Sequence, residues 1–185
     1  MTDLVSMRFS PPEKWWDGKD GKGNYYVQGI TKVCNAVSKN RNHKLNMIEI
    51  GVWRGESTSL FALSGFFESI DTIDPWDNEY HDQLKNEFDI NTRHWDYIKH
   101  HTEYSYNCAD KFHDKSYDLV YIDGAHDYKS AKQDIELFLP KVRKGCWIGG
   151  HDYMVSGFGV TKAVNELLGK PYHIFRDSSW LFQIK

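Results

Sequence analysis

The chain has 185 residues, enough for one domain with a substantial core, and its contents of 40% hydrophobic and 26% charged residues are those of an ordinary soluble globular protein. A formal net charge of -3 provides no basic surface for nucleic acid or an anionic membrane, and no apolar run is long enough to span a bilayer. Three scattered cysteines (Cys34, Cys108 and Cys146) and the lack of an apolar leader predict reduced thiols and a cytoplasmic location. A small molecule is therefore the expected partner, and the oligomeric state stays open.

Residues 1–23 are predicted to form an irregular N-terminal segment, because they contain Pro11-Pro12 and a polar, glycine-rich run. Trp15 and Trp16 in this segment either close the mouth of a ligand site or anchor the segment, and anchoring is slightly favoured. From Asn24 onward, apolar residues recur at helical spacing: Val27, Ile30, Val33, Cys34 and Val37. A single domain is expected over residues 24–185, and this helix should cover its sheet.

Residues 47–57 read Met-Ile-Glu-Ile-Gly-Val-Trp-Arg-Gly-Glu-Ser, which predicts a buried strand that runs into a glycine turn. A helix is expected to begin near Ser57, where Ser57, Thr58 and Ser59 are all good capping residues. In open α/β sheets such a turn lies at the carboxyl end of the first strand, where a ligand meets the amides of the helix.

The spacing Glu49-x-Gly51-x-x-x-Gly55 differs from the Gly-x-Gly-x-x-Gly fingerprint of dinucleotide sites and places an acid inside the strand, which suits a cationic ligand. The next predicted strand, residues 69–73, ends at Asp74, about 20 residues after the glycines, where an acid accepts hydrogen bonds from ribose hydroxyls. A nucleoside that carries a cation indicates S-adenosylmethionine.

The remaining chain alternates predicted helices and strands. A helix over residues 80–90, with Tyr80, Leu84 and Phe88 as its stripe, precedes a weak strand over residues 96–101. Strands at 118–122 and 146–148 flank a helix at 129–139 that Pro140 ends, and a last helix at 160–168 precedes a hairpin of 172–176 and 180–184. His94, His100, His101 and His113 lack ligand-like spacing and are expected to be solvated or packed.

The chain resembles the class I S-adenosylmethionine-dependent methyltransferases, and over residues 30–185 it is similar to the branch with macrocin-type sugar O-methyltransferases and cephalosporin hydroxylase-like proteins. Besides the glycine turn, the matching blocks are Asp118-Leu-Val-Tyr-Ile-Asp-Gly-Ala-His-Asp-Tyr128, Leu139-Pro-Lys-Val-Arg-Lys-Gly145 and Gly149-Gly-His-Asp-Tyr153. The resemblance implies an α/β, Rossmann-like fold: a mostly parallel seven-stranded sheet with helices on both faces and an antiparallel last strand.

The resemblance also implies roles for individual residues. Glu49, Gly51 and Gly55 would face the amino-acid end of S-adenosylmethionine, Asp74 would hold the ribose, and Ser105 would lie near the adenine. The full set of expected cofactor contacts is Glu49, Gly51, Trp53, Gly55, Ser57, Asp74, Ser105 and Asp123.

Asp123 and Asp152 follow adjacent strands and should meet at the carboxyl edge of the sheet, beside His126 and His151. The two carboxylates could hold Mg²⁺ or Mn²⁺, and such an ion would chelate vicinal hydroxyls of the substrate. In the related metal-dependent methyltransferases an acid after the fourth strand and an acidic pair after the fifth bind the metal, whereas here His151 replaces the first member of that pair.

The expected activity is O-methylation of a hydroxyl on a small molecule, sugar-like molecules included. His126 or His151 would accept the proton, since the pKa of histidine lies near neutrality, with Asp123 as the further catalytic candidate. A helix-capping or supporting role is the alternative for each histidine. Two other functions stay open: a metal-dependent hydrolase or hydroxylase-like enzyme, which would bind an ion but no S-adenosylmethionine, and a noncatalytic module, which would bind the cofactor without transferring its methyl group.

Overall fold

The computed structural model describes residues 23–77 and 79–185, so the predicted irregular segment, with Trp15 and Trp16, falls outside the described residues apart from Gly23. The helices are α1 (Gly23–Ser38), α2 (Glu56–Leu63), α3 (His81–Thr92), α4 (Ser105–Cys108), α5 (Tyr128–Phe138) and α6 (Val160–Leu167), with 3-10 turns at Ala109–Lys111 and Leu139–Lys141. The strands are β1 (Leu45–Ile50), β2 (Phe67–Ile73), β3 (Ile98–His101), β4 (Tyr117–Ile122), β5 (Val142–Gly150), β6 (His173–Ile174) and β7 (Trp180–Gln183).

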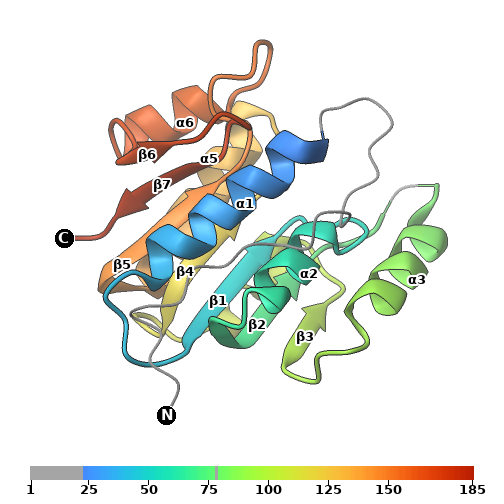
Figure 1. Cartoon of the computed structure of the whole chain (residues 1–185). Coiled ribbons are helices and arrows are strands. Elements are labelled where there is room, and N and C mark those ends of the chain that lie inside the picture. Colours follow the sequence, from blue (N-terminus) through green and yellow to red (C-terminus); the bar gives the residue numbers. More distant parts are fainter. Residues whose placement is uncertain (1–22, 78) are drawn as a thin grey trace.

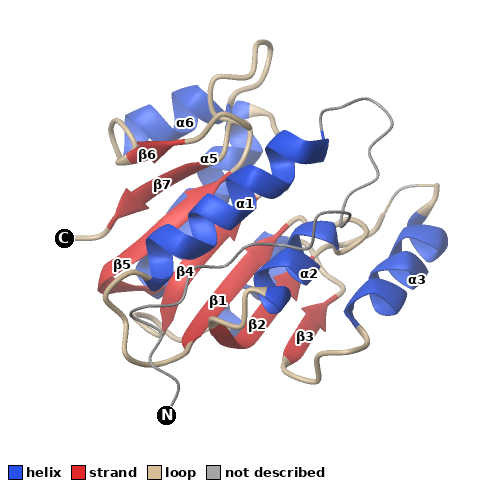
Figure 2. Ribbon diagram, viewed as in Figure 1, coloured by secondary structure: helices blue, strands red, loops and turns tan. Residues whose placement is uncertain are grey.

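The seven strands form one sheet in the order β3-β2-β1-β4-β5-β7-β6 (Figure 2). Strands β1 to β5 run parallel, whereas β7 pairs antiparallel with β5 and β6 pairs antiparallel with β7. The direction in which the chain adds strands reverses between β1 and β4, and in such sheets the ligand crevice lies at this point. The predicted Rossmann-like sheet with an antiparallel last strand is confirmed.

Helices cover both faces of the sheet (Figure 1). Helices α1, α2 and α3 lie on one face, where Ile30, Leu60 and Phe61 pack against residues of β1 and β4. Helices α5 and α6 lie on the other face, where Ile135 and Val164 join the second half of the core. Because the central strands are covered on both sides, β4 is buried from Asp118 through Ile122.

Most predicted elements are present, and two local expectations were wrong. In α1, Ile30, Val33, Cys34 and Val37 are buried as expected, while the side chain of Val27 falls outside the described residues. Tyr80 is 59% exposed and lies outside the inward stripe of α3, because the helix begins one residue later, at His81.

The second error concerns the start of α2. Helix α2 begins at Glu56, and its N-cap is Gly55 in the left-handed conformation, so Ser57 and Thr58 do not cap the helix with their hydroxyls. Both hydroxyls donate hydrogen bonds to the carboxylate of Glu49 instead.

Cys34, Cys108 and Cys146 are buried free thiols. Within the described part of the chain, no helix combines the length and the hydrophobicity that crossing a membrane requires.

The turn between β6 and β7 packs beneath α1. The side chain of Asp177 is only 2% exposed, and it accepts hydrogen bonds from the backbone N–H and the hydroxyl of Ser179. A Cβ placed on Gly29 of α1 would lie 1.6 Å from Asp177 Oδ2, so the helix can approach the turn this closely only with glycine at this position.

We predict that Gly29→Ala destabilises the protein, although alanine in a helix usually stabilises by roughly 0.5 to 1 kcal/mol relative to glycine. The collision with Asp177 should lower the free energy of unfolding by roughly 1 to 3 kcal/mol, measured by urea denaturation. In an Asp177→Ala background the collision is absent, so the same substitution should there be neutral or stabilising. A stability gain from Gly29→Ala in the wild-type background would contradict this packing.

Candidate functional site

A cavity of about 630 Å³ opens at the carboxyl ends of β1, β2 and β4, within the size range of small-molecule sites. Seven of the predicted site residues line it: Gly51, Trp53, Ser57, Asp74, Ser105, Asp123 and His126. Glu49 and Gly55 are not on its wall, and His151 and Asp152 line a smaller neighbouring cavity that Asp123 and His126 share.

The glycine turn brings the end of β1 against the end of β4. Gly51 has φ 78°, and a Cβ there would lie 2.2 Å from the carbonyl oxygen of Asp123. The backbone N–H of Asp123 in turn donates to the carbonyl of Ile50 at 2.7 Å. Any side chain at position 51 would therefore push the two strand ends apart, and these ends form the floor of the cavity.

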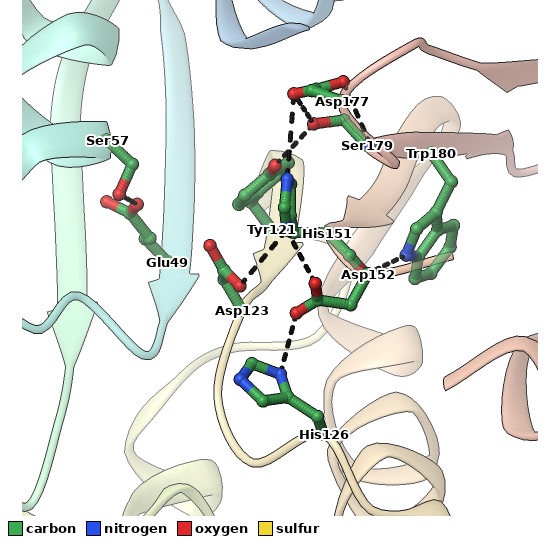
Figure 3. Close-up of polar contacts among 10 residues, drawn as sticks. All are labelled: Glu49, Ser57, Tyr121, Asp123, His126, His151, Asp152, Asp177, Ser179 and Trp180. Carbon is green, nitrogen blue, oxygen red and sulfur yellow. Dashed lines mark hydrogen bonds and ion pairs between the residues drawn. The ribbon is translucent and has the colours of Figure 1, made fainter. Parts of the chain in front are cut away.

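Glu49 lies behind the cavity wall. It is fully buried, and its two carboxylate oxygens accept hydrogen bonds from the hydroxyls of Ser57 and Thr58 (Figure 3 shows Glu49 and Ser57). Burial raises the pKa of Glu49 to about 8, although the two hydroxyl bonds oppose this. Glu49 therefore reaches the cavity through Ser57, and a direct contact with a ligand stays a prediction.

Asp74 holds the glycine turn in place. Its Oδ2 accepts the backbone N–H groups of Val52 and Trp53, each at 3.0 Å, and its Oδ1 accepts that of Trp76 at 2.9 Å. Because a carboxylate has about four acceptor positions, about one is left for a ligand hydroxyl. The predicted ribose contact thus has less room than a free carboxylate would offer, and it stays a prediction.

Five residues from the loops after β4 and β5 and from the β6–β7 turn form the group that we call the Asp–His cluster: Asp123, His126, His151, Asp152 and Asp177 (Figure 3). Asp152 lies between the two histidines, with Oδ2 2.8 Å from His126 Nδ1 and Oδ1 3.1 Å from His151 Nδ1. His151 also lies 4.0 Å from Asp123 Oδ1 through Nδ1 and 3.8 Å from Asp177 Oδ2 through Nε2. Asp123 and Asp152 thus converge with both histidines, as the sequence predicted.

The carboxylates of the cluster determine whether His126 and His151 are charged. Burial lowers the pKa of His151, but the hydrogen bond that His151 donates to Asp152 and the charges of Asp123, Asp152 and Asp177 outweigh burial and raise the pKa to about 9. The hydrogen bond to Asp152 likewise raises the pKa of His126. Burial raises the pKa of Asp123 to about 6. His151 is therefore a cation at neutral pH.

The cluster also contains a set of atoms suited to a metal ion. Asp123, His126 and Asp152 each offer a ligand atom, and these atoms all lie within 4.8 Å of one another. Two carboxylate oxygens and one imidazole nitrogen are a donor set that Mg²⁺, Mn²⁺ or Zn²⁺ accepts.

Sequence reasoning missed two acids that the structure brings to the site. Asp177 lies in the turn of the predicted hairpin, and its contact with His151 depends on how the hairpin folds back onto β5. Asp134 lines the cavity from α5. Helical periodicity could have found it, since Asp134 lies three residues after the buried Ala131 and four before the buried Phe138.

Comparison with known families identifies the class of protein. A family model described as a methyltransferase domain matches residues 48–153, more than half of the chain, so the chain belongs to this methyltransferase family. The methyltransferase predicted from the sequence is confirmed at this level. No curated protein sequence matches the chain.

Solved structures share the fold at low sequence identity. A Staphylococcus aureus protein provisionally described as a caffeoyl-CoA O-methyltransferase aligns with a TM-score of 0.64 at 19% identity, covering 84% of this chain and 80% of that one. For the TDP-rhamnose 3'-O-methyltransferase of calicheamicin biosynthesis the TM-score is 0.59 at 16% identity, with 85% and 76% covered. A Bacillus cereus O-methyltransferase in complex with SAH gives 0.56 at 16% identity, with 92% and 81% covered. At these identities the likeness establishes the fold.

We predict that Glu49→Gln changes how stability depends on pH. Because the folded-state pKa of Glu49 is raised to about 8 from its usual 4.5, its contribution to stability is fully present below pH 4.5 and is lost as pH rises through 8. Between pH 4.5 and 8 the free energy of unfolding of the wild type should therefore fall, relative to that of the variant, by up to ~1.4 kcal/mol per pH unit. Urea denaturation of both proteins between pH 5 and 8.5 tests this, and parallel curves would show that Glu49 does not titrate there.

Proposed function

We propose that this methyltransferase transfers the methyl group of S-adenosylmethionine to a hydroxyl group of a small molecule. The observation that carries the proposal is the cavity itself: in a chain of the methyltransferase family, it lies at the strand-order reversal and is lined by Gly51, Asp74 and Asp123. Neighbours of the same fold include one with bound SAH and one that acts on TDP-rhamnose, which supports this cofactor and a sugar-like acceptor.

S-adenosylmethionine would supply the methyl group on a cationic sulfonium. In our proposal Gly51, Trp53 and Ser57 bind its amino-acid end through the turn and the start of α2. The remaining acceptor position of Asp74 binds a ribose hydroxyl, and Asp123 adds negative charge near the sulfonium. Gly55 caps α2 and Glu49 accepts the hydroxyl of Ser57, so both support this part of the site, and their direct contact with the amino-acid end stays a prediction.

His126 is the better candidate for the proton acceptor. It lines the cavity, and its Nδ1 lies 2.8 Å from Asp152, while its Nε2 forms no ion pair with a carboxylate among the described residues. Both ring nitrogens of His151 face carboxylates, and this histidine is not on the wall of the main cavity. In the proposed mechanism Asp152 orients His126 and stabilises its protonated form, which is the role of the acid that supports a histidine base.

The alternative to a histidine base is a divalent ion bound by the Asp–His cluster. Asp123, Asp152 and His126 fit it as ligands, and the ion would supply Lewis acidity that lowers the pKa of a substrate hydroxyl. The cationic His151 shares Asp123 and Asp152 with such an ion and would compete with it. His126 cannot be ligand and base through the same nitrogen, so the two arrangements make different predictions.

The two other functions are tested by the same measurements. A hydrolase would not bind S-adenosylmethionine, and a noncatalytic module would bind it without releasing labelled methyl to any hydroxyl compound. The buried free thiols agree with the proposed cytoplasmic location.

The cofactor prediction is tested by calorimetric binding of S-adenosylhomocysteine. The wild type should bind it, and Asp74→Ala should weaken binding roughly 10- to 100-fold, because a charged acceptor and the anchor of the glycine turn are both lost. Asp89→Ala, which removes an exposed acid of α3, serves as the control. Absence of binding by the wild type would overturn the proposed function, and unchanged affinity in Asp74→Ala would remove Asp74 from the site.

The base prediction is tested with methyl-labelled S-adenosylmethionine and a panel of sugar nucleotides and catechols. His126→Ala should lower the rate of label transfer on the order of 10²- to 10⁴-fold and leave S-adenosylhomocysteine affinity nearly unchanged. If His126 is a metal ligand instead, excess Mn²⁺ should restore part of the rate, and EDTA should abolish transfer by the wild type. A His126→Ala enzyme with the wild-type rate would leave the proton step to His151 or Asp123.

A further inference from the structure

The segment that follows β5 contacts His126 in three ways. Asp152 Oδ2 lies 2.8 Å from His126 Nδ1, and the backbone N–H of Gly159 donates to the carbonyl oxygen of His126 at 2.8 Å. The third contact is apolar, since the ring of Phe158 stacks on the imidazole with 4.6 Å between the ring centroids and 10° between the ring planes. The mechanism proposed above gives this aromatic ring no role.

The backbone that carries Phe158 is held against two neighbouring elements. A Cβ placed on Gly159 would lie 2.1 Å from the backbone nitrogen of Tyr128, so any side chain there would push the segment away from the loop after β4. The backbone N–H of Met154 donates to the hydroxyl of Thr161 at 2.7 Å, which ties the start of the segment to α6. The ring of Phe158 therefore approaches the imidazole from a well-supported position.

The imidazole of His126 needs such a neighbour, because one polar contact does not fix the plane of a ring. The His126 side chain is 42% exposed, and its hydrogen bond to Asp152 alone would let the ring rotate about that bond. A parallel aromatic ring opposes the rotation, since a turned imidazole would lose its contact with the ring face. Nε2 then stays on the side of the imidazole away from Asp152 (Figure 3), in a residue that lines the cavity.

We propose that Phe158 is a positioning residue, which holds the imidazole of His126 in the orientation that lets Nε2 accept the proton of the acceptor hydroxyl. This inference rests on the proposed function. In the transfer step the hydroxyl oxygen bonds to the methyl carbon, the carbon–sulfur bond breaks to give S-adenosylhomocysteine, and the hydroxyl proton passes to Nε2. Phe158 does not belong to the described residues that line the main cavity, so it acts through His126 and not on the acceptor.

The kinetic test follows label transfer from methyl-labelled S-adenosylmethionine to the panel of sugar nucleotides and catechols. Phe158→Leu should lower kcat roughly 10- to 100-fold, because a misaligned base loses its approach to the hydroxyl. KM for the acceptor and the affinity for S-adenosylhomocysteine should stay nearly unchanged. Phe158→Tyr keeps the aromatic ring and should retain the wild-type kcat to within about threefold. Met154→Ala is the matched control, because it removes a more exposed apolar side chain, 71% against 41%, from the same segment.

A double variant separates positioning from a general structural role. If Phe158 acts only through His126, adding Phe158→Leu to His126→Ala should slow transfer by no more than about twofold, because the group that Phe158 holds is already absent. A structural role would give the same loss in both backgrounds.

The stacked geometry is tested without any transfer by NMR of the protein alone. The ring current of Phe158 should place the Cε1–H signal of His126 upfield in the wild type and in Phe158→Tyr. In Phe158→Leu the signal should move downfield, and Met154→Ala should leave it in place. A signal that does not move in Phe158→Leu would show that the rings are not stacked and would overturn the inference.

The kinetic outcomes separate this inference from the proposed function. Absence of label transfer by the wild type to every compound of the panel would overturn both. Transfer by the wild type with an unchanged kcat in Phe158→Leu would overturn the role of Phe158 alone. A raised KM at unchanged kcat would do the same, since Phe158 would then bind the acceptor. Far-UV circular dichroism establishes that the variants are folded.

Discussion

The close approach of β1 and β4 at Gly51 is the constraint on which the site depends. With a Cβ 2.2 Å from the Asp123 carbonyl, no other residue lets the strand ends meet without displacing backbone. This contact positions the glycine turn, which leads from β1 into α2. It also positions the loop after β4, which carries Asp123 and His126. The part of the cavity beside the glycine turn and the Asp–His cluster thus both depend on one backbone contact.

The Asp–His cluster connects the loops after β4 and β5 to the β6–β7 turn near the C-terminal end of the sequence. Three carboxylates surround His151, and one of them, Asp177, comes from the β6–β7 turn beneath α1. The indole N–H of Trp180 in β7 also donates to the carbonyl of His151 at 3.2 Å. A cation held by three acids stabilises charges that would be costly to bury alone, because each would lack a partner. The hairpin therefore supports the site as well as closing the sheet.

The sequence alone predicts the structural features that depend on a local pattern of residues. The buried strands, the amphipathic helices and the glycine turn follow from periodicity and residue type, and parallel strands necessarily bring Asp123 and Asp152 to one edge. Asp127 precedes α5 and caps that helix, accepting hydrogen bonds from the N–H groups of Lys129 and Ser130. What could not be predicted depends on side-chain direction. The sequence is equally consistent with Ser57 as a helix cap and with Ser57 as a hydrogen-bond partner of Glu49. The hydroxyl of Ser57 bonds to Glu49 because α2 packs closely on β1.

Asp177 shows the other limit of sequence reasoning. Its neighbours Ser178 and Ser179 indicate a turn, and nothing local shows that α1 will press on it at Gly29 or that His151 will lie 3.8 Å away. Contacts of this kind join segments far apart in the chain, and their register is set by the whole sheet.

Three acids in or directly behind the cavity wall have raised pKa values: Glu49 at about 8, Asp123 at about 6 and Asp134 at about 6. In each case burial is the main cause, since it disfavours the charged form. A cationic ligand in the cavity would favour the charged forms of these acids, so binding and loss of protons are coupled. Without a ligand, some of these buried acids can stay protonated and uncharged. When a cation binds, the acids become negatively charged and attract it. Buried acids whose pKa values lie near neutrality can thus lie in or behind the wall of a site for a cation without destabilising the empty protein by their full charge.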